Sequence, residues 1–564
     1  MSPDTLTETT PPTPINPADP YERRAQTFPR LTDEQVERAA EFGVVQALTR
    51  GTVLFDRGDR TVDFFIVVEG TIEIYEPSPS GPTVFTTLGK NQFTGELDLF
   101  SDRENLVGGR MATTGSVIRT RRAQFRRLLV AEPDIAEIVM RAFILRRVGI
   151  LEHEQAASTV IGSRTSGDTL RIYRFLDRNG YPVRLLDPDI SQEARDTLAA
   201  RTLGDDDLPV VLTAYAQVLK NPSNRELAVA VGLVERIDPD AVFDVAVVGA
   251  GPAGLAAAVY SASEGLRTVV LEAEAPGGQA GTSSKIENYL GFPTGISGPA
   301  LAGRAQVQAQ KFGAQLAVPR RVAALRCDAS PYTLELEDGE RVRAKTVVIA
   351  TGARYRKLDL ENFDRFEGFG IHYAATAIEA ALCEGEEVIV VGGGNSAGQA
   401  ATYLSRHASR VHVLVRGAEL AASMSDYLIG RINASRTIVL HTQTEIVRLE
   451  GKRHLEAVTW RNNRTGAEET RNISTIFLML GATPNTEWLR DCIRLDESGF
   501  VRCGAGFEQQ GEGHTDRLPH ALETSRRGVF AVGDVRSGSV KRVASSVGEG
   551  SIVVSAIHAV LAGT

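Results

Sequence analysis

Apolar and polar positions alternate with different periods along the chain, and each change of period predicts a different kind of domain. Short β runs follow one another after residue 44, and the clearest extends from Asp63 to Tyr75, alternating apolar and polar side chains beyond Gly70. This pattern is typical of antiparallel strands with one buried face. A long amphipathic helix is predicted from Pro133 to Glu152, and strand and helix patterns alternate from residue 156 onwards. We therefore expect an N-terminal β domain followed by α/β domains.

The strongest single pattern is a glycine turn that directly follows an apolar strand. The run Asp244–Val248 passes into Gly249-Ala-Gly251-Pro-Ala-Gly254 and an alanine-rich helix, and the next strand ends at Glu272. In such a unit the first glycine permits the tight turn, the second lets the backbone approach a pyrophosphate, and the third lets helix and strand pack closely. The acid after the second strand suits an adenosine ribose. This order of elements predicts a dinucleotide site.

A second unit of the same kind follows. The strand from Glu387 leads into Gly392-Gly-Gly394-Asn-Ser-Ala397, and the strand Arg410–Val415 ends at Arg416 without a carboxylate. An arginine at this position suits the 2′-phosphate of NADP(H). Glu419, close by, weakens that preference, so NADH stays possible as the second nucleotide. We therefore assign NADPH to the second site, with NADH as the alternative, and FAD to the first site.

Residues 29–155 resemble a cyclic-nucleotide-binding domain. The features that carry the resemblance are Gly51–Phe55, the Gly58-Asp59 turn, Phe64–Tyr75 and the cassette Gly95-Glu96-Leu97. The resemblance implies a β jelly roll in which Glu96 takes the ribose hydroxyl and Arg103 takes the cyclic phosphate. However, Arg103 comes early and is followed by Glu104, which would oppose a phosphate, and Arg110 is a second candidate. We expect either a tentative cyclic-nucleotide site at Gly95, Glu96 and Arg103 or a degenerate module that contacts protein.

Residues 156–238 resemble a small glutaredoxin- or thioredoxin-like domain, with Pro209 as its cis proline. Strand and helix patterns alternate in it, at Thr159–Gly162, 169–179, Pro182–Leu186, from 191 and Leu208–Leu212. Thiol exchange in that fold needs a cysteine at the first helix N-terminus, where the helix dipole favours the thiolate. Thr165-Ser-Gly-Asp168 stands there instead. We expect a docking or spacer role.

From Phe243 onwards the chain resembles bacterial thioredoxin reductase. The resemblance includes both glycine turns, Gly277-Gly278-Gln279, Lys285–Pro293, Val347–Gly352, Gly481–Asn485 and Phe530–Asp534. It implies that Gln279 and Asn288 lie at the isoalloxazine, that Asp534 bonds the ribitol, and that a helix beginning near Arg542 points its N-terminus at the flavin. The NADP contacts are expected at Gly392, Gly394, Asn395, Ser396 and Arg416. The expected FAD contacts are Gly249, Gly251, Pro252, Ala253, Gly254, Glu272, Gly278, Gln279, Asn288, Val322, Thr351, Gly352, Gly533, Asp534, Arg542, Val543 and Ala544.

The chain departs from thioredoxin reductases at the redox centre. Where those enzymes carry Cys-Ala-Thr-Cys-Asp, this sequence reads Ala374-Ala375-Thr376-Ala377-Ile378. A dithiol relay needs a thiolate nucleophile and a resolving thiol, and methyl groups supply neither. No catalytic residue is therefore assigned, and Ala374 and Ala377 mark the lost cysteine positions. The resemblance still implies hydride transfer from nicotinamide to flavin, because that chemistry belongs to the cofactors.

Composition limits the remaining function classes. The net charge is −9 and no basic stripe is present, so neither nucleic acid nor an anionic membrane is an expected partner. No apolar run reaches membrane-spanning length, and the N-terminus lacks the basic and apolar regions of a signal peptide, so we expect a cytoplasmic protein. The four cysteines form no Cys-x-x-Cys, so neither a disulfide scaffold nor a metal site is expected.

These inferences give a multidomain α/β chain with an N-terminal β jelly roll and two Rossmann-like domains of the thioredoxin reductase type. The expected function is an FAD-dependent NAD(P)H oxidoreductase that forms a homodimer and passes electrons to an unknown protein, quinone or small-molecule acceptor. Disulfide reduction is not expected, because the redox Cys-x-x-Cys is missing. The alternative is a regulatory flavoprotein whose N-terminal module senses a ligand or docks a partner. The expected segments are a disordered tail 1–28, the domains 29–155 and 156–238, an FAD domain 239–355 and 486–564, and an inserted NAD(P)H domain 356–485.

Overall fold

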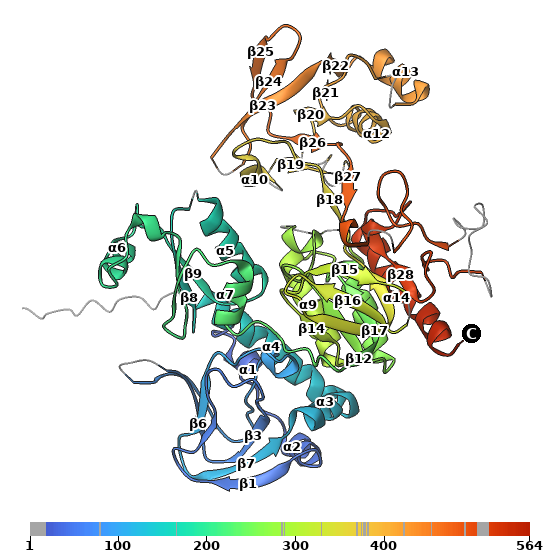
Figure 1. Cartoon of the computed structure of the whole chain (residues 1–564). Coiled ribbons are helices and arrows are strands. Elements are labelled where there is room, and N and C mark those ends of the chain that lie inside the picture. The colour runs from blue at the N-terminus through green and yellow to red at the C-terminus, as the bar shows by residue number, and fades with distance from the viewer. Residues whose placement is uncertain are drawn as a thin grey trace, which may run out of the picture.

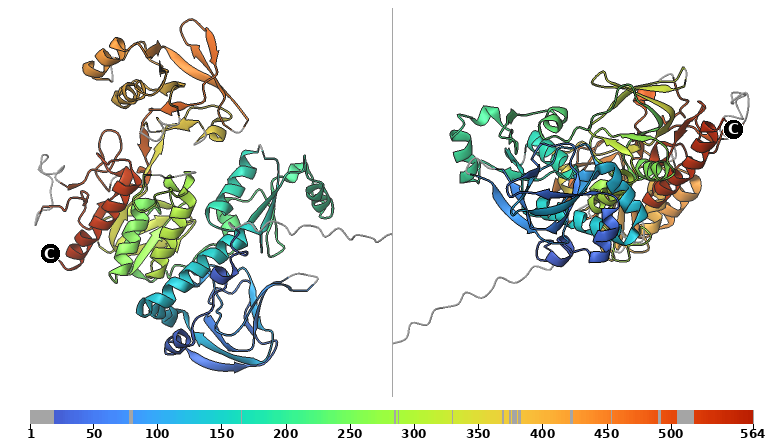
Figure 2. Two further views of the ribbon diagram at one scale, coloured as in Figure 1. Left: turned by 180° about the vertical axis from the view of Figure 1, so that it is seen from behind. Right: turned by 90° about the horizontal axis from the view of Figure 1, so that it is seen from below.

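The computed structural model describes residues 19–563 except for 78–80, 165, 284–285, 287, 329, 368–369, 374, 376–379, 381–382, 421–423, 453, 490–491 and 505–517. The chain folds into an N-terminal β domain, a small α/β domain, an FAD-type domain and a second Rossmann-like domain joined to the FAD-type domain by a narrow connection (Figure 1). The view from behind in Figure 2 shows the same arrangement. The N-terminal β domain and the second Rossmann-like domain lie at opposite ends of the molecule.

The N-terminal domain forms two antiparallel sheets, with strand orders β1-β7-β3 and β2-β6-β4-β5. A capping box of Thr32 and Gln35 starts α2, and α4 has the predicted bounds. Its core includes the stacked rings of Phe64 and Phe125. The elements are α1 (Arg24–Thr27), α2 (Asp33–Ala40), β1 (Val44–Leu48), β2 (Val53–Phe55), β3 (Phe64–Glu69), β4 (Ile72–Glu76), β5 (Thr83–Leu88), η1 (Leu97–Phe100), β6 (Gly108–Met111), β7 (Gly115–Thr120), α3 (Arg122–Ala131) and α4 (Pro133–Glu152).

The predicted disordered tail, 1–28, extends too far. Residues 1–18 lie outside the described residues, but α1 packs on α4 and the Thr27 side chain is buried. The Tyr21 hydroxyl donates to Gln155 Oε1 at 2.6 Å, and the Phe28 ring is buried. Aromatic side chains anchor this segment although it has no helical or strand period, so the pattern alone missed it.

The second domain contains a sheet of order β11-β10-β8-β9, in which β8 and β9 are parallel and β10 is antiparallel to both of its neighbours. The Leu208–Pro209 peptide bond is cis, as predicted. The glutaredoxin- or thioredoxin-like assignment stays a prediction. The elements are β8 (Ser158–Ile161), α5 (Gly167–Arg178), β9 (Val183–Leu186), α6 (Gln192–Ala199), η2 (Asp205–Asp207), β10 (Val210–Leu212), β11 (Val218–Lys220) and α7 (Asn224–Ala230).

The FAD-type domain is built on a sheet of order β14-β13-β12-β17-β16-β15, with β28 paired to β17. Alternate residues of β12 face two cores: Val245 and Val247 pack with α8 and α14, whereas Ala246 and Val248 pack on the opposite face. The elements are β12 (Val242–Val248), α8 (Pro252–Ser263), β13 (Thr268–Leu271), η3 (Ala280–Thr282), α9 (Gly298–Lys311), β14 (Gln315–Ala317), β15 (Val322–Arg326), β16 (Tyr332–Leu336), β17 (Arg341–Ile349), η4 (Glu487–Leu489), β28 (Val529–Ala531), η6 (Gly533–Val535) and α14 (Val543–Leu561).

The second Rossmann-like domain is inserted between β17 and β28, and two short paired strands connect it. β18 (Ala353–Tyr355) and β27 (Ala482–Pro484) are antiparallel, at the top of the FAD-type domain in Figure 1. The inserted domain combines a parallel sheet, β19-β26-β20-β21-β22, with the antiparallel sheet β23-β24-β25. Its elements are α10 (Phe363–Phe366), β19 (Ile371–His372), β20 (Glu387–Val391), α12 (Asn395–Leu404), β21 (Arg410–Val415), α13 (Asp426–Ala434), β22 (Ile438–Thr442), β23 (Thr444–Glu450), β24 (Ala457–Asn462), β25 (Glu468–Arg471) and β26 (Ile476–Leu478).

Two expectations drawn from composition are wrong. α14 is long and apolar enough, by length and composition, to cross a membrane, because its scattered polar residues hide a high mean hydropathy. In this fold it packs on α8, where Gly550 lets the helices approach: a Cβ there would lie 2.2 Å from the Ala253 carbonyl oxygen. In addition, Cys327 and Cys492 form a disulfide with their Cα atoms 6.0 Å apart. They are 165 residues apart in sequence, so no spacing motif revealed the pair.

Candidate functional site

The first glycine turn has the shape that a bound pyrophosphate requires. Gly249 has a φ of 103°, and a Cβ on it would lie 2.4 Å from the Ala350 carbonyl oxygen. A Cβ on Gly254 would lie 1.9 Å from the Gly249 carbonyl oxygen, so both glycines are required by the backbone itself. At Gly251 the nearest atom to an added Cβ is the Gly278 Cα at 3.9 Å. The space in front of Gly251 is therefore left open by the protein, at the N-terminus of α8, where phosphate oxygens would lie.

Glu272 lies directly after β13, as the sequence predicts for a ribose-binding acid. Its carboxylate accepts hydrogen bonds from the amides of Ala250 (2.7 Å) and Glu274 (2.9 Å). Burial raises the pKa of this carboxyl, and the two amide bonds oppose that effect. Each oxygen accepts one of these bonds and keeps acceptor capacity for a hydroxyl.

Asp534 is the clearest unsatisfied group of the FAD-type domain. It lies on η6 beside the N-terminus of α14, and its Oδ1 is buried with no hydrogen-bond partner among the described residues. Burial raises the pKa of the Asp534 carboxyl. Since buried acceptors in native proteins are rarely left unpaired, this oxygen is well suited to a ligand hydroxyl. Arg542 caps α14, which begins at Val543 and Ala544 as predicted, so its positive end is available to an anion.

Two other predicted FAD residues, Gln279 and Thr351, bond to the segments that connect the inserted domain. Gln279 Nε2 donates to the Ala353 carbonyl of β18 (2.8 Å), and Thr351 Oγ1 donates to the Asn485 carbonyl (2.7 Å). Ala253 packs near Gly533, where a Cβ would lie 2.9 Å from the Ala253 Cβ. Three more of these residues are described: Val322 is buried at the start of β15, Gly352 follows Thr351 with a φ of 65°, and Asn288 is exposed.

The second glycine turn repeats part of this geometry. Gly392 has a φ of 145°, and a Cβ on it would lie 2.6 Å from the Met479 carbonyl oxygen. Gly394 caps α12, followed by the exposed Asn395 and Ser396. The Asn395 side chain accepts a bond from the Ser425 amide (2.8 Å). Arg416 is exposed at the carboxyl end of β21, where a 2′-phosphate would be read.

The four cysteines are one disulfide pair and two free thiols in separate parts of the fold. Ala374 and Ala377, at the lost cysteine positions, lie outside the described residues, whereas Ala375 packs against the core of the inserted domain. Cys383 is buried in that same core. Burial raises the pKa of the Cys503 thiol to about 12. The other two cysteines, Cys327 and Cys492, are bonded to each other.

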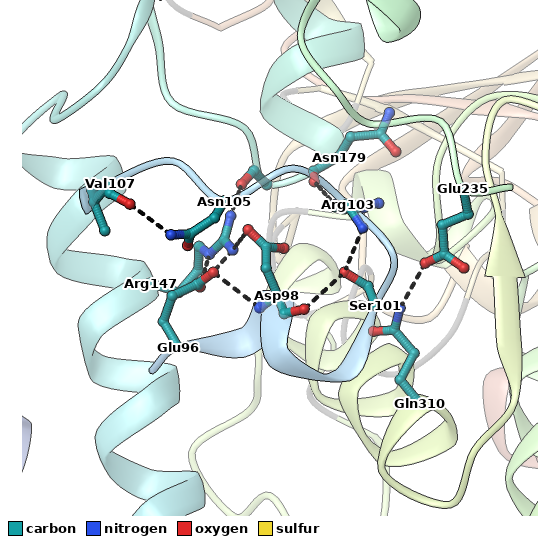
Figure 3. Close-up of polar contacts among 11 residues, drawn as sticks. Glu96, Asp98, Ser101, Arg103, Asn105, Val107, Arg147, Asn179, Glu235 and Gln310 are labelled. Carbon is teal, nitrogen blue, oxygen red and sulfur yellow. Dashed lines mark hydrogen bonds and ion pairs between the residues drawn. The ribbon is translucent and has the colours of Figure 1, made fainter. Parts of the chain in front are cut away.

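The cassette of the N-terminal domain holds a buried ion-pair cluster (Figure 3). Arg147 of α4 donates to Glu96 Oε2 through Nε (2.8 Å) and contacts Asp98 Oδ2 (2.6 Å). Although burial opposes the charge, these two carboxylates raise the pKa of Arg147. Glu96, the predicted ribose ligand, is thus already paired within the protein. Gly95, the first cassette residue, has a φ of 104° and accepts a bond from Arg146 at its carbonyl (2.8 Å).

The predicted phosphate ligands are also engaged. Arg103 is buried and donates to the Asn179 carbonyl of the second domain (3.0 Å), as drawn in Figure 3. Arg110 pairs with Glu73 at 3.0 Å, and Glu104 pairs with Arg60 at 2.8 Å. The pocket at the cassette encloses about 60 Å³ and is lined by apolar side chains, among them Tyr21 and Phe28 of the N-terminal segment, and by charged ones, among them Glu96 and Arg103. Small-molecule sites commonly offer roughly 300–1,000 Å³.

Sequence reasoning missed Arg147, although a signal was present. Arg146 and Arg147 interrupt the apolar stretch of α4, and both are buried. Buried arginines are rare unless they are paired, so two in succession on a core helix indicate buried acceptors elsewhere. Their partners lie about fifty residues earlier in the sequence, at Glu96 and the Gly95 carbonyl.

We expect isothermal titration calorimetry of the full chain to detect no micromolar binding of cAMP. Binding would have to separate Glu96 from Arg147, a buried charge pair that costs about 3–5 kcal/mol to break, and would also have to break the hydrogen bond from Arg103 to the Asn179 carbonyl. A matched Arg147→Ala variant, which frees Glu96, tests whether that pair is the obstacle. Micromolar affinity in the wild type that Arg103→Ala abolishes would contradict this expectation.

The fold contains two Rossmann-like domains, one inserted in the other. The first has an open phosphate turn and the second has an exposed arginine, and together these features define a pyridine-nucleotide-dependent flavoprotein. The chain belongs to the family described as pyridine nucleotide-disulphide oxidoreductase, whose model matches residues 243–550. The model of the cyclic nucleotide-binding domain matches residues 45–132. The predicted jelly roll and the predicted FAD-dependent NAD(P)H oxidoreductase are thereby confirmed.

Thioredoxin reductases are among the similar proteins. That of Mycoplasmopsis pulmonis is 32% identical over 317 residues, which cover 55% of this chain and 95% of the relative. NADPH-dependent thioredoxin reductase 3 of Arabidopsis thaliana is 34% identical over 316 residues, and the chain covers 56% of its length. The solved thioredoxin reductase of Streptococcus pyogenes is 29% identical, with a TM-score of 0.50 over 58% of this chain and 100% of that chain. The predicted cofactors, FAD and NADPH, are those of this family.

Proposed function

We propose that the protein oxidises NAD(P)H at its flavin and delivers the electrons directly to an acceptor, without a dithiol relay. The observation that carries the proposal is the state of all four cysteines: two are bonded to each other, Cys383 is buried in the inserted domain, and Cys503 is a half-buried thiol with a raised pKa. A relay needs two exchanging thiols near the flavin, and thiolate character is what makes a thiol reactive.

The residues that would hold the cofactors follow from the fit described above. The turn at Gly249–Gly254 and the α8 N-terminus suit the pyrophosphate of FAD, Glu272 suits its ribose, and Asp534 Oδ1 suits a ribitol hydroxyl. FAD, when bound, supplies the hydride and electron chemistry. The protein's part is to orient the two nucleotides and exclude water. The paired strands β18 and β27 are the connection about which the inserted domain would have to move to bring the nicotinamide close.

The acceptor is proposed as a class. A small one-electron carrier protein, a quinone and a small molecule all take electrons without forming a disulfide. One relative, 30% identical over 309 residues, is described as the 34.2 kDa protein in the rubredoxin operon of Clostridium pasteurianum. That description supports a carrier-protein acceptor as one member of the class.

A second candidate function is a regulatory flavoprotein. The match to a cyclic nucleotide-binding domain and the hydrogen bonds that join the cassette to the second domain favour it. In this function the N-terminal module senses a ligand or docks a partner, and the flavin half serves as a redox sensor or scaffold.

Anaerobic stopped-flow mixing with NADPH separates the two functions. Rapid loss of flavin absorbance, followed by steady turnover with ferricyanide or menadione, supports the oxidoreductase. Nucleotide binding seen by calorimetry without flavin reduction would contradict it and leave the regulatory function.

We expect Arg416→Ala to raise the KM for NADPH about tenfold while leaving the KM for NADH unchanged, because a charge-assisted bond to the 2′-phosphate would be lost. The matched control is Arg436→Ala. Arg436 is also exposed, but it precedes β22 and so lies at the opposite edge of the parallel sheet from the nucleotide side. An equal loss for both nucleotides would show that Arg416 does not read the phosphate.

A further inference from the structure

The last turn of α5 lies between the cassette of the N-terminal domain and the glycine-rich loop of the FAD-type domain. We call residues 178–180 the α5 turn and residues 274–279 the flavin loop. Figure 3 shows Asn179 beside Arg103, which follows the cassette in the chain, and Figure 1 shows α5 facing the FAD-type domain. The α5 turn contacts both neighbours through hydrogen bonds.

On the cassette side, the α5 turn offers backbone carbonyls. Arg103 Nη1 donates to the Asn179 carbonyl (3.0 Å), and Arg147 Nη1 donates to the Gly180 carbonyl (3.1 Å). Both arginines are buried, and Arg147 is held by Glu96 and Asp98. The carbonyls of the turn are thus fixed by charged donors whose positions the cassette determines.

On the other side, the α5 turn offers side chains. Asn179 Nδ2 donates to the Glu274 carbonyl (3.0 Å), and Arg178 Nη2 donates to the Gly278 carbonyl (3.2 Å). The Arg178 guanidinium also lies 3.8 Å from the Glu274 carboxylate. Two consecutive residues therefore hold the two ends of the flavin loop.

The flavin loop is the part of the FAD-type domain where small shifts matter. The Gly277 amide donates to the Ala250 carbonyl (2.7 Å), inside the phosphate turn. Gly278 faces Gly251, since a Cβ on Gly278 would lie 3.0 Å from the Gly251 Cα. The next residue, Gln279, bonds Ala353 of β18. The loop thus joins the phosphate turn to the connection of the inserted domain.

We propose that Arg178 and Asn179 are positioning residues for the flavin, and that the cassette acts on them through Arg103 and Arg147. This inference rests on FAD occupying the Gly249–Gly254 turn, as in the proposed function, and is independent of the acceptor. It assigns the second domain a mechanical role: its α5 turn transmits the arrangement of the cassette to the flavin loop. A separate polar contact comes from α9 of the FAD-type domain, where Gln310 Nε2 lies 3.4 Å from Glu235 Oε1.

The test compares Arg178→Ala and Asn179→Ala with Arg171→Ala in the full chain. Arg171 is a matched control because it lies on the same helix and its hydrogen bonds, to Asp168, Asn221, Pro222 and Asn224, all stay within the second domain. The readouts are amide hydrogen exchange of residues 274–279, with and without FAD, the circular dichroism of the flavin, and the rate of flavin reduction by NADPH.

We expect exchange in the flavin loop to become about tenfold faster in both variants, because each loses one bond to a loop carbonyl. Flavin reduction should slow about three- to tenfold, the usual range for residues that couple sites without touching the ligand. Arg171→Ala should match the wild type in all three readouts, and Tm should stay within about 5 °C throughout.

Arg103→Ala tests the link to the cassette. If the α5 turn transmits the effect, Arg103→Ala with Arg178→Ala should slow reduction no more than the stronger single variant, whereas independent sites would add. Wild-type exchange and reduction in both Arg178→Ala and Asn179→Ala would overturn the proposal, whether or not Arg103→Ala folds. A colourless wild-type protein would instead refute the FAD assignment, so the two failures are distinguishable.

Discussion

Valine in place of Gly251 is expected to leave the protein folded and colourless. The structure leaves open space in front of Gly251, so the added side chain meets no backbone atom of the protein closer than the Gly278 Cα at 3.9 Å from its Cβ. That same space is where the pyrophosphate would lie, and forcing extra carbon atoms into an occupied site costs about 3 kcal/mol. The affinity for FAD should therefore fall at least a hundredfold, roughly. The flavin to protein absorbance ratio of the purified variant measures the loss.

Gly303→Val is the matched control for this substitution. Gly303 lies exposed on α9, and a Cβ there meets nothing within 4 Å. This variant should keep its full complement of FAD and the same Tm. A Gly251→Val protein that stays fully yellow would remove the assignment of the first glycine turn to FAD.

The protein is expected to reduce thioredoxin with NADPH at least a thousandfold more slowly, roughly, than a dithiol thioredoxin reductase does. The cysteine positions of that relay are Ala374 and Ala377, and of the two free thiols Cys383 is buried and Cys503 is half-buried with a raised pKa. Activity with ferricyanide or menadione should persist, since it needs no thiol. Insulin-coupled thioredoxin assays and diaphorase assays on the same sample measure both.

Cys383→Ser and Cys503→Ser should leave the diaphorase activity within about twofold of the wild type, because neither thiol exchanges electrons. The disulfide cysteines are left in place in this test, since removing a native disulfide commonly costs about 2–5 kcal/mol of stability. Loss of activity through Cys383→Ser in a folded protein would restore a thiol mechanism.

The sequence predicted the two glycine turns because strand, turn and helix follow one another directly in the chain. Only Gly254 is required by an atom of its own turn, the Gly249 carbonyl oxygen, whereas Gly249 and Gly392 are required by the Ala350 and Met479 carbonyl oxygens of distant segments. The bounds of α4 were also predicted from a local pattern, because Pro133 starts it and apolar residues recur along its length. The inserted arrangement of the second nucleotide domain followed from the family resemblance.

Contacts between segments that are far apart in the sequence could not be predicted. Arg103 was expected to hold a phosphate, but its partner is a backbone carbonyl 76 residues away, on a helix whose packing no local pattern specifies. The pairing of Glu96 with Arg147 likewise joins segments 51 residues apart. The Cys327–Cys492 bond and the folded residues 19–28 depend on tertiary packing in the same way.

The FAD-type sheet receives its last strand, β28, only after the inserted domain in the chain, and this sets the order of folding events during synthesis. β28 pairs with β17, and Asp534 and α14 follow it, so the FAD-type domain is incomplete until the whole inserted domain has left the ribosome. Domains generally fold as units while the chain is being made. The inserted domain can therefore fold while the FAD-type sheet still lacks a strand. FAD binding is therefore a late, post-translational step. Until then the FAD-type sheet lacks β28, and this incomplete sheet is the form that a chaperone would bind.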